Sequence, residues 1–221
     1  MKTKQERSAI FKSFQANIGK KDTFDEGKYG LLELRAQFVV ICDLVFDTCD
    51  GEDFCKMPFA KDKTMAYYLF HLARIEDIVT NVLIADGEQL FFSQGFGASI
   101  KSPIATTGNE LTRDKLIDFS KKLDIVQLKK YYNAVMLNTN KIIHNMTFEE
   151  SKTKVSAEKK GKLVASNAVS ADPNAFWLVD YWCRKTYGGL MLMPLSRHHM
   201  VHLGGGCLRI TDKIKFTKHY S

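Results

Sequence analysis

The 221-residue chain is 45% hydrophobic and 26% charged, which excludes a disordered protein and predicts one globular domain with a substantial core. Its net charge of +7 permits weak attraction to anions, but the longest apolar stretch, residues 38–46, contains Asp43 and is too short to cross a bilayer. The basic N-terminus is not followed by the apolar core of a signal peptide, and the five cysteines form no CxxC pair. We therefore expect a cytoplasmic protein with reduced thiols and no membrane partner.

Apolar residues recur every three or four positions in the first half of the chain, which predicts amphipathic helices. A short helix is expected over residues 5–18 and a first long helix over residues 29–48. The second long helix is expected to start after Thr64, a good N-cap residue, and to run to about residue 84. The apolar stripe of the first long helix consists of Leu31, Leu34, Phe38, Ile41 and Val45.

The second half begins with residues 95–109, which contain three glycines and a proline and are interpreted as a loop or crossover. Asn109 is expected to cap a helix over residues 110–121, and Asp124 to open a third long helix. Another helix and a histidine-rich segment follow, and the basic tail after Ile210 is expected to be extended or frayed. No stretch alternates with a period of two. The predicted fold class is therefore all-α, a helical bundle with at least one crossover.

Residues 147–171 are rich in lysine and contain few acids. We interpret them as a solvated helix or crossover, because charge runs are usually exposed faces. No aromatic residues interleave these lysines, so the stacking surface of a single-strand binding protein is missing. A nucleic-acid partner is accordingly not expected.

Three of the six histidines fall within residues 198–202. His198 and His202 are four positions apart, so on a helix their imidazoles share one face and can hold one metal ion. No glutamate stands at the second position, so the zinc-protease pattern H-E-x-x-H is absent. A third ligand must come from elsewhere, and His71, at the edge of the stripe of the second long helix, is the leading candidate. Three neutral imidazoles suit zinc, nickel or iron and leave positions open for water or substrate.

The alternative interpretation places His198 and His202 at the surface and makes His71 a core histidine bonded to a tyrosine. His199 points about 100° away from His198 on a helix and is expected outside the ligand set, either behind it or at the surface.

Other residues near the histidines have ordinary structural roles in this interpretation. Glu76 is expected in a surface salt bridge, and Cys207 as a buried structural thiol. Tyr67, Arg74 and Arg197 either line the pocket or are ordinary bundle residues.

Several short motifs, taken in their order, resemble the DinB-like (YfiT-type) family of four-helix bundle proteins. They are residues 70–76 (Phe-His-Leu-Ala-Arg-Ile-Glu), residues 177–182, residues 194–198 and the pair His198-x-x-x-His202. The resemblance covers about residues 28–212, which leaves residues 1–27 as an N-terminal helical extension and residues 213–221 as a tail. It implies an up-down-down-up bundle with a long crossover and extra short helices, often a homodimer.

The resemblance also implies a metal centre of one histidine from the second helix and two from the last, here His71, His198 and His202, with nickel or zinc as the divalent ion. Some relatives are thiol-dependent transferases. The first hypothesis is therefore a metal-dependent transferase or hydrolase that acts on a small-molecule substrate or a low-molecular-weight thiol. The second is a non-catalytic bundle that acts by dimerisation or partner binding. One departure is the run 204–206, three glycines expected either to fray the last helix or to leave room for a ligand.

Overall fold

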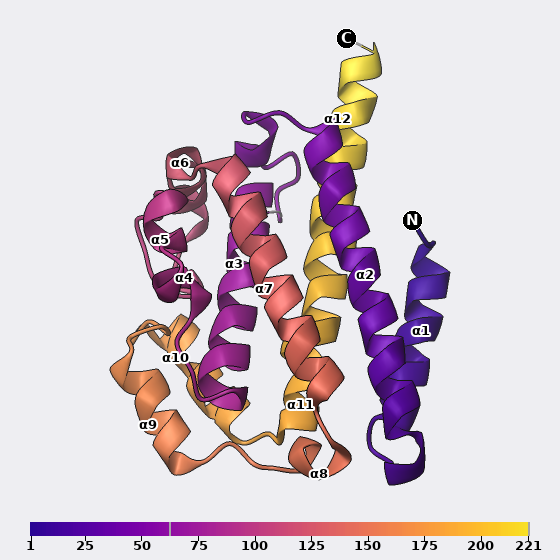
Figure 1. The fold of residues 1–221 in the computed structure, drawn as a ribbon. Helices are drawn as coiled ribbons and strands as arrows, with labels where there is room; N and C mark the ends of the chain where they lie inside the picture. The colour runs from indigo at the N-terminus through magenta and orange to yellow at the C-terminus, as the bar shows by residue number, and fades with distance from the viewer. Residues whose placement is uncertain (62, 221) are drawn as a thin grey trace.

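The chain folds into helices. The computed structural model describes residues 1–61 and 63–220, and in these ranges it contains no β-strand, only an isolated bridge between Lys154 and Thr186 (Figure 1). The predicted all-helical class is thereby confirmed. The α-helices are α1 (Lys4–Asn17), α2 (Phe24–Thr48), α3 (Met65–Asp77), α4 (Leu90–Ser93), α5 (Phe96–Ser99), α6 (Leu116–Lys122), α7 (Ile125–Asn145), α8 (Phe148–Ser151), α9 (Ala157–Ala165), α10 (Pro173–Cys183), α11 (Tyr187–Met191) and α12 (Leu208–Tyr220). Three π-helical segments are η3 (Ile78–Ile84), η5 (Met193–Arg197) and η6 (Met200–Cys207), and three 3-10 turns are η1 (Lys21–Thr23), η2 (Asp53–Cys55) and η4 (Arg113–Lys115).

The long helices form where the sequence predicts them. Thr64 caps α3, since its side chain accepts a hydrogen bond from the backbone N–H of Tyr67, and Asp124 caps α7 in the same way. All five stripe residues of α2 are buried in the core. The helix predicted over residues 110–121 is shorter, because α6 begins only at Leu116, after η4, and Asn109 does not cap it.

α3 and α7 run in the same direction. Arg74 contacts Tyr131, and seven residues later in each helix Asn81 contacts Asn138. Two neighbouring parallel helices cannot be joined by a short turn. Residues 85–124, which include α4, α5 and α6, therefore cross from one end of the molecule to the other (Figure 1).

The last long element, which we call the C-terminal helix, comprises η5, His198, His199, η6 and α12, residues 193–220. It runs parallel to α2 and antiparallel to α3, as their paired contacts show. α2 and the C-terminal helix therefore point one way, and α3 and α7 the other (Figure 1). The contacts are Arg35 with Leu195 and Cys49 with Thr211 for α2, and His71 with His198 and Met65 with Thr211 for α3.

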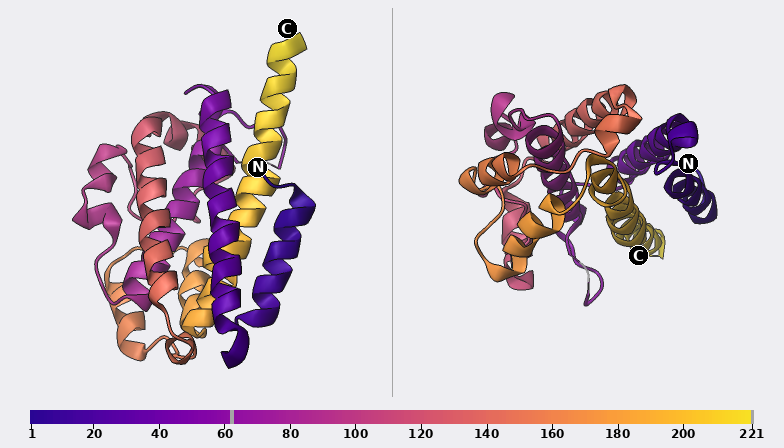
Figure 2. Two further views of the ribbon diagram at one scale, coloured as in Figure 1. Left: turned by 45° about the vertical axis from the view of Figure 1, so that its right-hand side comes forward. Right: turned by 90° about the horizontal axis from the view of Figure 1, so that it is seen from below.

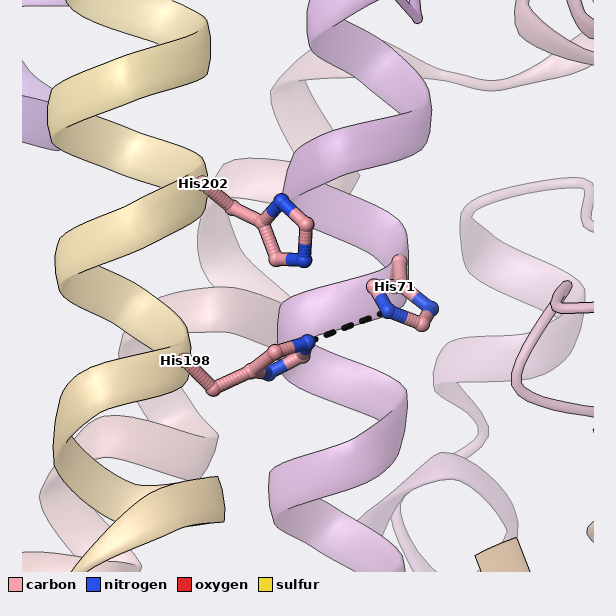
Figure 3. Close-up of side chains that lie close together, drawn as sticks. All are labelled: His71, His198 and His202. Atoms are coloured by element: carbon pink, nitrogen blue, oxygen red, sulfur yellow. Dashed lines mark hydrogen bonds between the residues drawn. The ribbon is translucent and has the colours of Figure 1, made fainter. Parts of the chain in front are cut away.

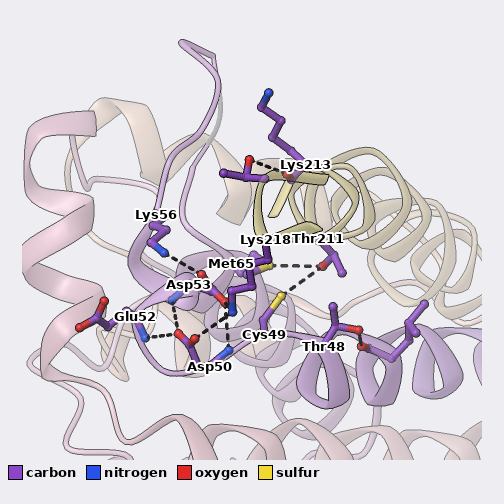
Figure 4. A network of polar contacts seen from close by, with 12 residues as sticks. Thr48, Cys49, Asp50, Glu52, Asp53, Lys56, Met65, Thr211, Lys213 and Lys218 are labelled. Atoms are coloured by element: carbon purple, nitrogen blue, oxygen red, sulfur yellow. Dashed lines mark hydrogen bonds and ion pairs between the residues drawn. The ribbon is translucent and has the colours of Figure 1, made fainter. Parts of the chain in front are cut away.

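The expectation of an extended or frayed tail is wrong. α12 continues to Tyr220, and its residues Ile210 and Ile214 are buried. Near its end the ammonium of Lys218 lies 2.9 Å from the Asp50 carboxylate and 2.7 Å from the Asp53 carboxylate, which follow α2 (Figure 4). These distant acids compensate the charge of Lys218, one of the lysines that made the segment look like a solvated tail.

The expected boundaries at residues 28 and 212 both fall inside helices, since α2 begins at Phe24 and α12 at Leu208. The division into an extension, a bundle and a tail stays a prediction. α1 packs along α2, on the outside of the four long elements (Figure 2). No helix in the described ranges combines the length and hydrophobicity that a membrane span requires.

Candidate metal centre

Two antiparallel helices bring the three predicted histidines together. His71 lies in the middle of α3, whose residues are buried along its whole length, while His198 and His202 lie one turn apart on the C-terminal helix. All three side chains point into the space between these helices (Figure 3). The surface location considered in the alternative interpretation does not apply, because neither His198 nor His202 is an exposed residue.

The spacing of the ring nitrogens fits a metal ion. Nε2 of His71 lies 3.2 Å from Nε2 of His198, and one nitrogen from each of the three rings lies within 4.8 Å of the others. Two imidazole nitrogens bound to one tetrahedral zinc ion at 2.0–2.1 Å would be about 3.3 Å apart. The three histidines can therefore hold a single ion without rearrangement of the helices.

His71 is oriented by a backbone carbonyl. Its Nδ1 lies 2.8 Å from the carbonyl oxygen of Thr107, which can only accept, so Nδ1 carries the proton and Nε2 presents its lone pair to the centre. The carbonyl belongs to the crossover between α5 and α6. Two residues before it, the Ala105 carbonyl accepts a hydrogen bond from the buried guanidinium of Arg74. The crossover thus fixes the tautomer of the ligand on α3.

All three imidazoles are neutral at neutral pH. Burial lowers the pKa of His71 to about 4, and burial together with the neighbouring His71 lowers the pKa of His202 to about 3. Burial and the same neighbours hold the pKa of His198 well below its ordinary value. Because a metal ion binds the unprotonated ring, the site needs no proton release at neutral pH.

The histidines face a cavity of about 410 Å³ between α3, the C-terminal helix and α10. One wall of the cavity is aromatic and comes from α10. Elsewhere in the lining, the ammonium of Lys63 lies 3.3 Å from the Tyr67 hydroxyl and 4.3 Å from the centre of the Tyr67 ring. A cavity of this size and lining suits a small organic molecule. The lining residues are Lys63, Tyr67, His71, Ile75, Asn109, Trp177, Leu178, Tyr181, Trp182, Met193, Pro194, His198 and His202.

His199 lies outside the ligand set, as expected, and it is fully buried on the other face of the C-terminal helix. Its Nε2 lies 2.7 Å from Oε2 of Glu76, its Nδ1 lies 3.1 Å from the Tyr132 hydroxyl, and its ring stacks on Phe38. These contacts fix the rotation of the helix about its axis. Since His198 is the next residue, they also fix the direction in which that ligand points.

The expectation that Glu76 forms a surface salt bridge is wrong. Its side chain is completely buried and accepts two hydrogen bonds from the Arg35 guanidinium, at 2.6 and 3.0 Å. Burial alone would raise the pKa of Glu76, but the Arg35 guanidinium and His199 beside it hold that pKa well below its usual range. The carboxylate is therefore charged and belongs to the support of the site.

Of the three residues that were considered for the pocket, only Tyr67 lines the histidine cavity. Tyr67 lines the cavity and stacks on the His71 ring, with centroids 5.3 Å apart. Arg74 instead lies in a buried network with Asp77, and Arg197 faces a different groove. Cys207 is buried as expected, and burial raises the pKa of its thiol.

Two functional residues escaped the reasoning from sequence. Thr107 acts through its backbone carbonyl, and because every residue has such a group, the amino-acid type does not indicate this role. Lys63 stands four positions before Tyr67 but precedes the helix start at Met65, so helical spacing does not predict its contact with the ring.

A comparison of the chain with protein-family models finds no match, and neither does a comparison with curated proteins.

Proposed function

We propose that this protein is a DinB-like metalloprotein whose residues His71, His198 and His202 hold one divalent ion, nickel or zinc, at the floor of a substrate cavity. The observation that carries the proposal is the convergence of three neutral imidazoles, one of them oriented by the Thr107 carbonyl, on an aromatic-walled cavity. Three nitrogen ligands would leave coordination positions open, as in catalytic rather than structural sites.

The directions of the long elements support the family assignment. α2, α3, α7 and the C-terminal helix run up, down, down and up, and the parallel pair α3 and α7 is joined by a long crossover (Figure 1). One histidine comes from the second of these elements and two come from the last. Both features are those that the resemblance implies.

The chemistry we propose is that of a metal-dependent transferase or hydrolase acting on a small molecule, with a low-molecular-weight thiol or water as the attacking group. A bound ion would supply Lewis acidity, which lowers the pKa of a thiol or water. The residues of the chain have separate tasks. Trp177 and Tyr181 bind the apolar part of the substrate, and Lys63 attracts a negatively charged group on it. The homodimer and the cytoplasmic location expected from the sequence stay predictions.

Metal analysis of protein produced without a histidine tag tests the proposal. We expect about one zinc or nickel ion per chain, and a loss of most of this metal in each of the variants His71→Ala, His198→Ala and His202→Ala. His144→Ala is the matched control, because His144 is exposed on α7 and should leave the metal content unchanged. Circular dichroism establishes that each variant is folded.

Metal-free protein whose affinity for added zinc is unaffected by His71→Ala would contradict the site. If metal is present, cobalt(II)-loaded protein tests the open positions. A small thiol that enters the coordination sphere produces a near-ultraviolet sulfur-to-cobalt absorption band. Stoichiometric metal without any change on addition of thiols or other small ligands would instead favour the non-catalytic bundle.

A further inference from the structure

A second groove lies on the opposite side of the C-terminal helix from the histidine cavity. It has a volume of about 530 Å³ and is lined by residues of α1, η5 and η6. α1 and the C-terminal helix both pack against α2 (Figure 2). The two cavities share no lining residue. The lining residues are Lys4, Arg7, Ser8, Phe11, Lys12, Gln15, Arg197, Met200, Val201, Gly204 and Gly205.

Arg7 is the central residue of this groove. It is only 7% exposed, yet its guanidinium forms no ion pair within the described ranges and donates a hydrogen bond only to the backbone carbonyl of Lys2. A buried guanidinium is costly unless a negative charge compensates it. Burial correspondingly lowers the pKa of Arg7. Its free N–H groups therefore define a place for an anion.

The rest of the groove has the same sign of charge. Lys4, Lys12 and Arg197 join Arg7 in its lining, and the lining contains no aspartate or glutamate. Four cations around a recess of this size exceed what one carboxylate can compensate. They match a phosphate monoester, which carries close to two negative charges and accepts bidentate hydrogen bonds from arginine.

Two glycines keep the floor of the groove open. A Cβ atom added at Gly205 would meet no atom within 4 Å, and one added at Gly204 would meet only Nη2 of Arg7, at 4.0 Å. Packing of the protein itself therefore does not require glycine at either position, although glycine weakens a helix. Both positions line the groove, and Gly204 also borders the Arg7 guanidinium, where a ligand would need the space.

The groove also has an apolar part. Phe11 is a buried lining residue, Met200 is half-buried, and Val201 is 53% exposed. A ligand with a charged head and an apolar body would cover all three. From these observations we propose that the groove between α1 and the C-terminal helix is a binding site for a small organic phosphate monoester, independent of the metal centre.

Isothermal titration with 1-naphthyl phosphate, in the presence of a chelator that removes metal from the histidines, tests this site. We expect one ligand per chain, bound at least about tenfold more tightly than 1-naphthol and than inorganic phosphate. Arg7→Gln should weaken the binding about tenfold or more, and Gly205→Leu should weaken it similarly by filling the floor. Lys20→Gln is the matched control, because Lys20 is exposed away from the groove, and it should change the affinity less than about twofold.

Stability measurements separate a ligand-binding arginine from a structural one. Because Arg7 has no anionic partner among the described residues, Arg7→Gln should leave the unfolding temperature of the ligand-free protein unchanged or raise it, while the stabilisation by naphthyl phosphate is lost. Absence of binding at millimolar concentration, or equal binding by wild type and both groove variants, would overturn the proposal. Loss of binding in Lys63→Gln but not in Arg7→Gln would also overturn it, since the ligand would then occupy the histidine cavity.

Discussion

The Nδ1–H group of His71 donates its hydrogen bond to a carbonyl group on the crossover, not to another side chain. The Thr107 oxygen holds Nδ1–H, and Arg74 holds the crossover two residues earlier. A carbonyl cannot change its protonation state, so this support is independent of pH. The ligand nitrogen therefore stays available wherever the imidazole itself remains neutral.

Protonation of the histidines should couple stability to pH in the metal-free protein. In the unfolded chain a histidine binds a proton below about pH 6.5, whereas in the folded protein His71 does so only near pH 4 and His202 near pH 3. Between these values the unfolded state binds more protons, so the free energy of unfolding falls as the pH is lowered from about 6.5 to about 4. Each histidine contributes up to about 1.4 kcal/mol per pH unit.

Urea denaturation of chelator-treated protein at several pH values measures this slope. His202→Gln should reduce it, since one proton fewer is taken up on unfolding. A wild-type slope equal to that of His202→Gln would contradict the buried, neutral state of His202.

The candidate metal ligands show how far the positions of single residues can be predicted from the sequence. His198 and His202 were found because their spacing is a property of one helix, and His71 because its position beside an apolar stripe indicates burial. Glu76 was misplaced for the opposite reason. Its partner Arg35 lies 41 positions away on another helix. The sequence around an acid beside an apolar stripe does not show whether that acid faces solvent or forms a buried ion pair.

At the scale of the element, the glycine run was the least predictable feature. The three glycines do not fray the C-terminal helix, since η6 passes through them into α12. Gly206 differs from its two neighbours. A Cβ there would lie 2.8 Å from Cε2 of Tyr68, whose ring contacts His202 with centroids 5.1 Å apart. Close packing of two helices therefore requires glycine at this one position.

Alanine substitutions should separate these roles. Gly206→Ala is expected to destabilise the protein by about 1–3 kcal/mol and to weaken metal binding, because Tyr68 must move against His202. Gly205→Ala, the matched control in open space, should stabilise it by about 0.5–1 kcal/mol. Chemical denaturation and zinc titration measure both effects. Equal destabilisation by the two alanines would show that the contact with Tyr68 is not the reason for the glycine.

Helices were predicted well where their signals are local. The N-caps Thr64 and Asp124 and the stripe of α2 depend on residues within one helix. The helical end of the chain was missed because Ile210 and Ile214 pack in the core and Lys218 pairs with Asp50 and Asp53, which precede it by 168 and 165 positions. A local pattern contains no information about such partners.

Across the whole molecule, one buried cluster joins all four long elements. The Arg35 guanidinium on α2 contacts Glu76 on α3, the backbone carbonyl of Met136 on α7 and that of Leu195 on the C-terminal helix. Asn140 also accepts a hydrogen bond from Arg35, at 2.6 Å. A single side chain thus sets the relative positions of the helices that hold the histidines.

Removal of the charge from Glu76 should therefore disturb the whole fold. Glu76→Gln leaves the Arg35 guanidinium buried without its counterion, and we expect a loss of about 3–5 kcal/mol in the free energy of unfolding. Asp180→Asn, which removes an exposed ion pair with Lys160, should leave the free energy of unfolding nearly unchanged. Urea denaturation followed by circular dichroism measures both. A loss below about 1 kcal/mol for Glu76→Gln would show that the cluster does not hold the four elements together.

The distance along the chain between the two halves of the histidine centre has a consequence for biosynthesis. His71 precedes His198 by 127 positions. At about 5–20 residues per second of translation, about 6–25 s pass between the synthesis of the two residues. During that interval α3 has no partner for its histidine, and a nascent chain cannot take up an ion through this set of ligands. Loading of the proposed ion would therefore belong to the last stage of folding, after the C-terminal helix has docked beside α3.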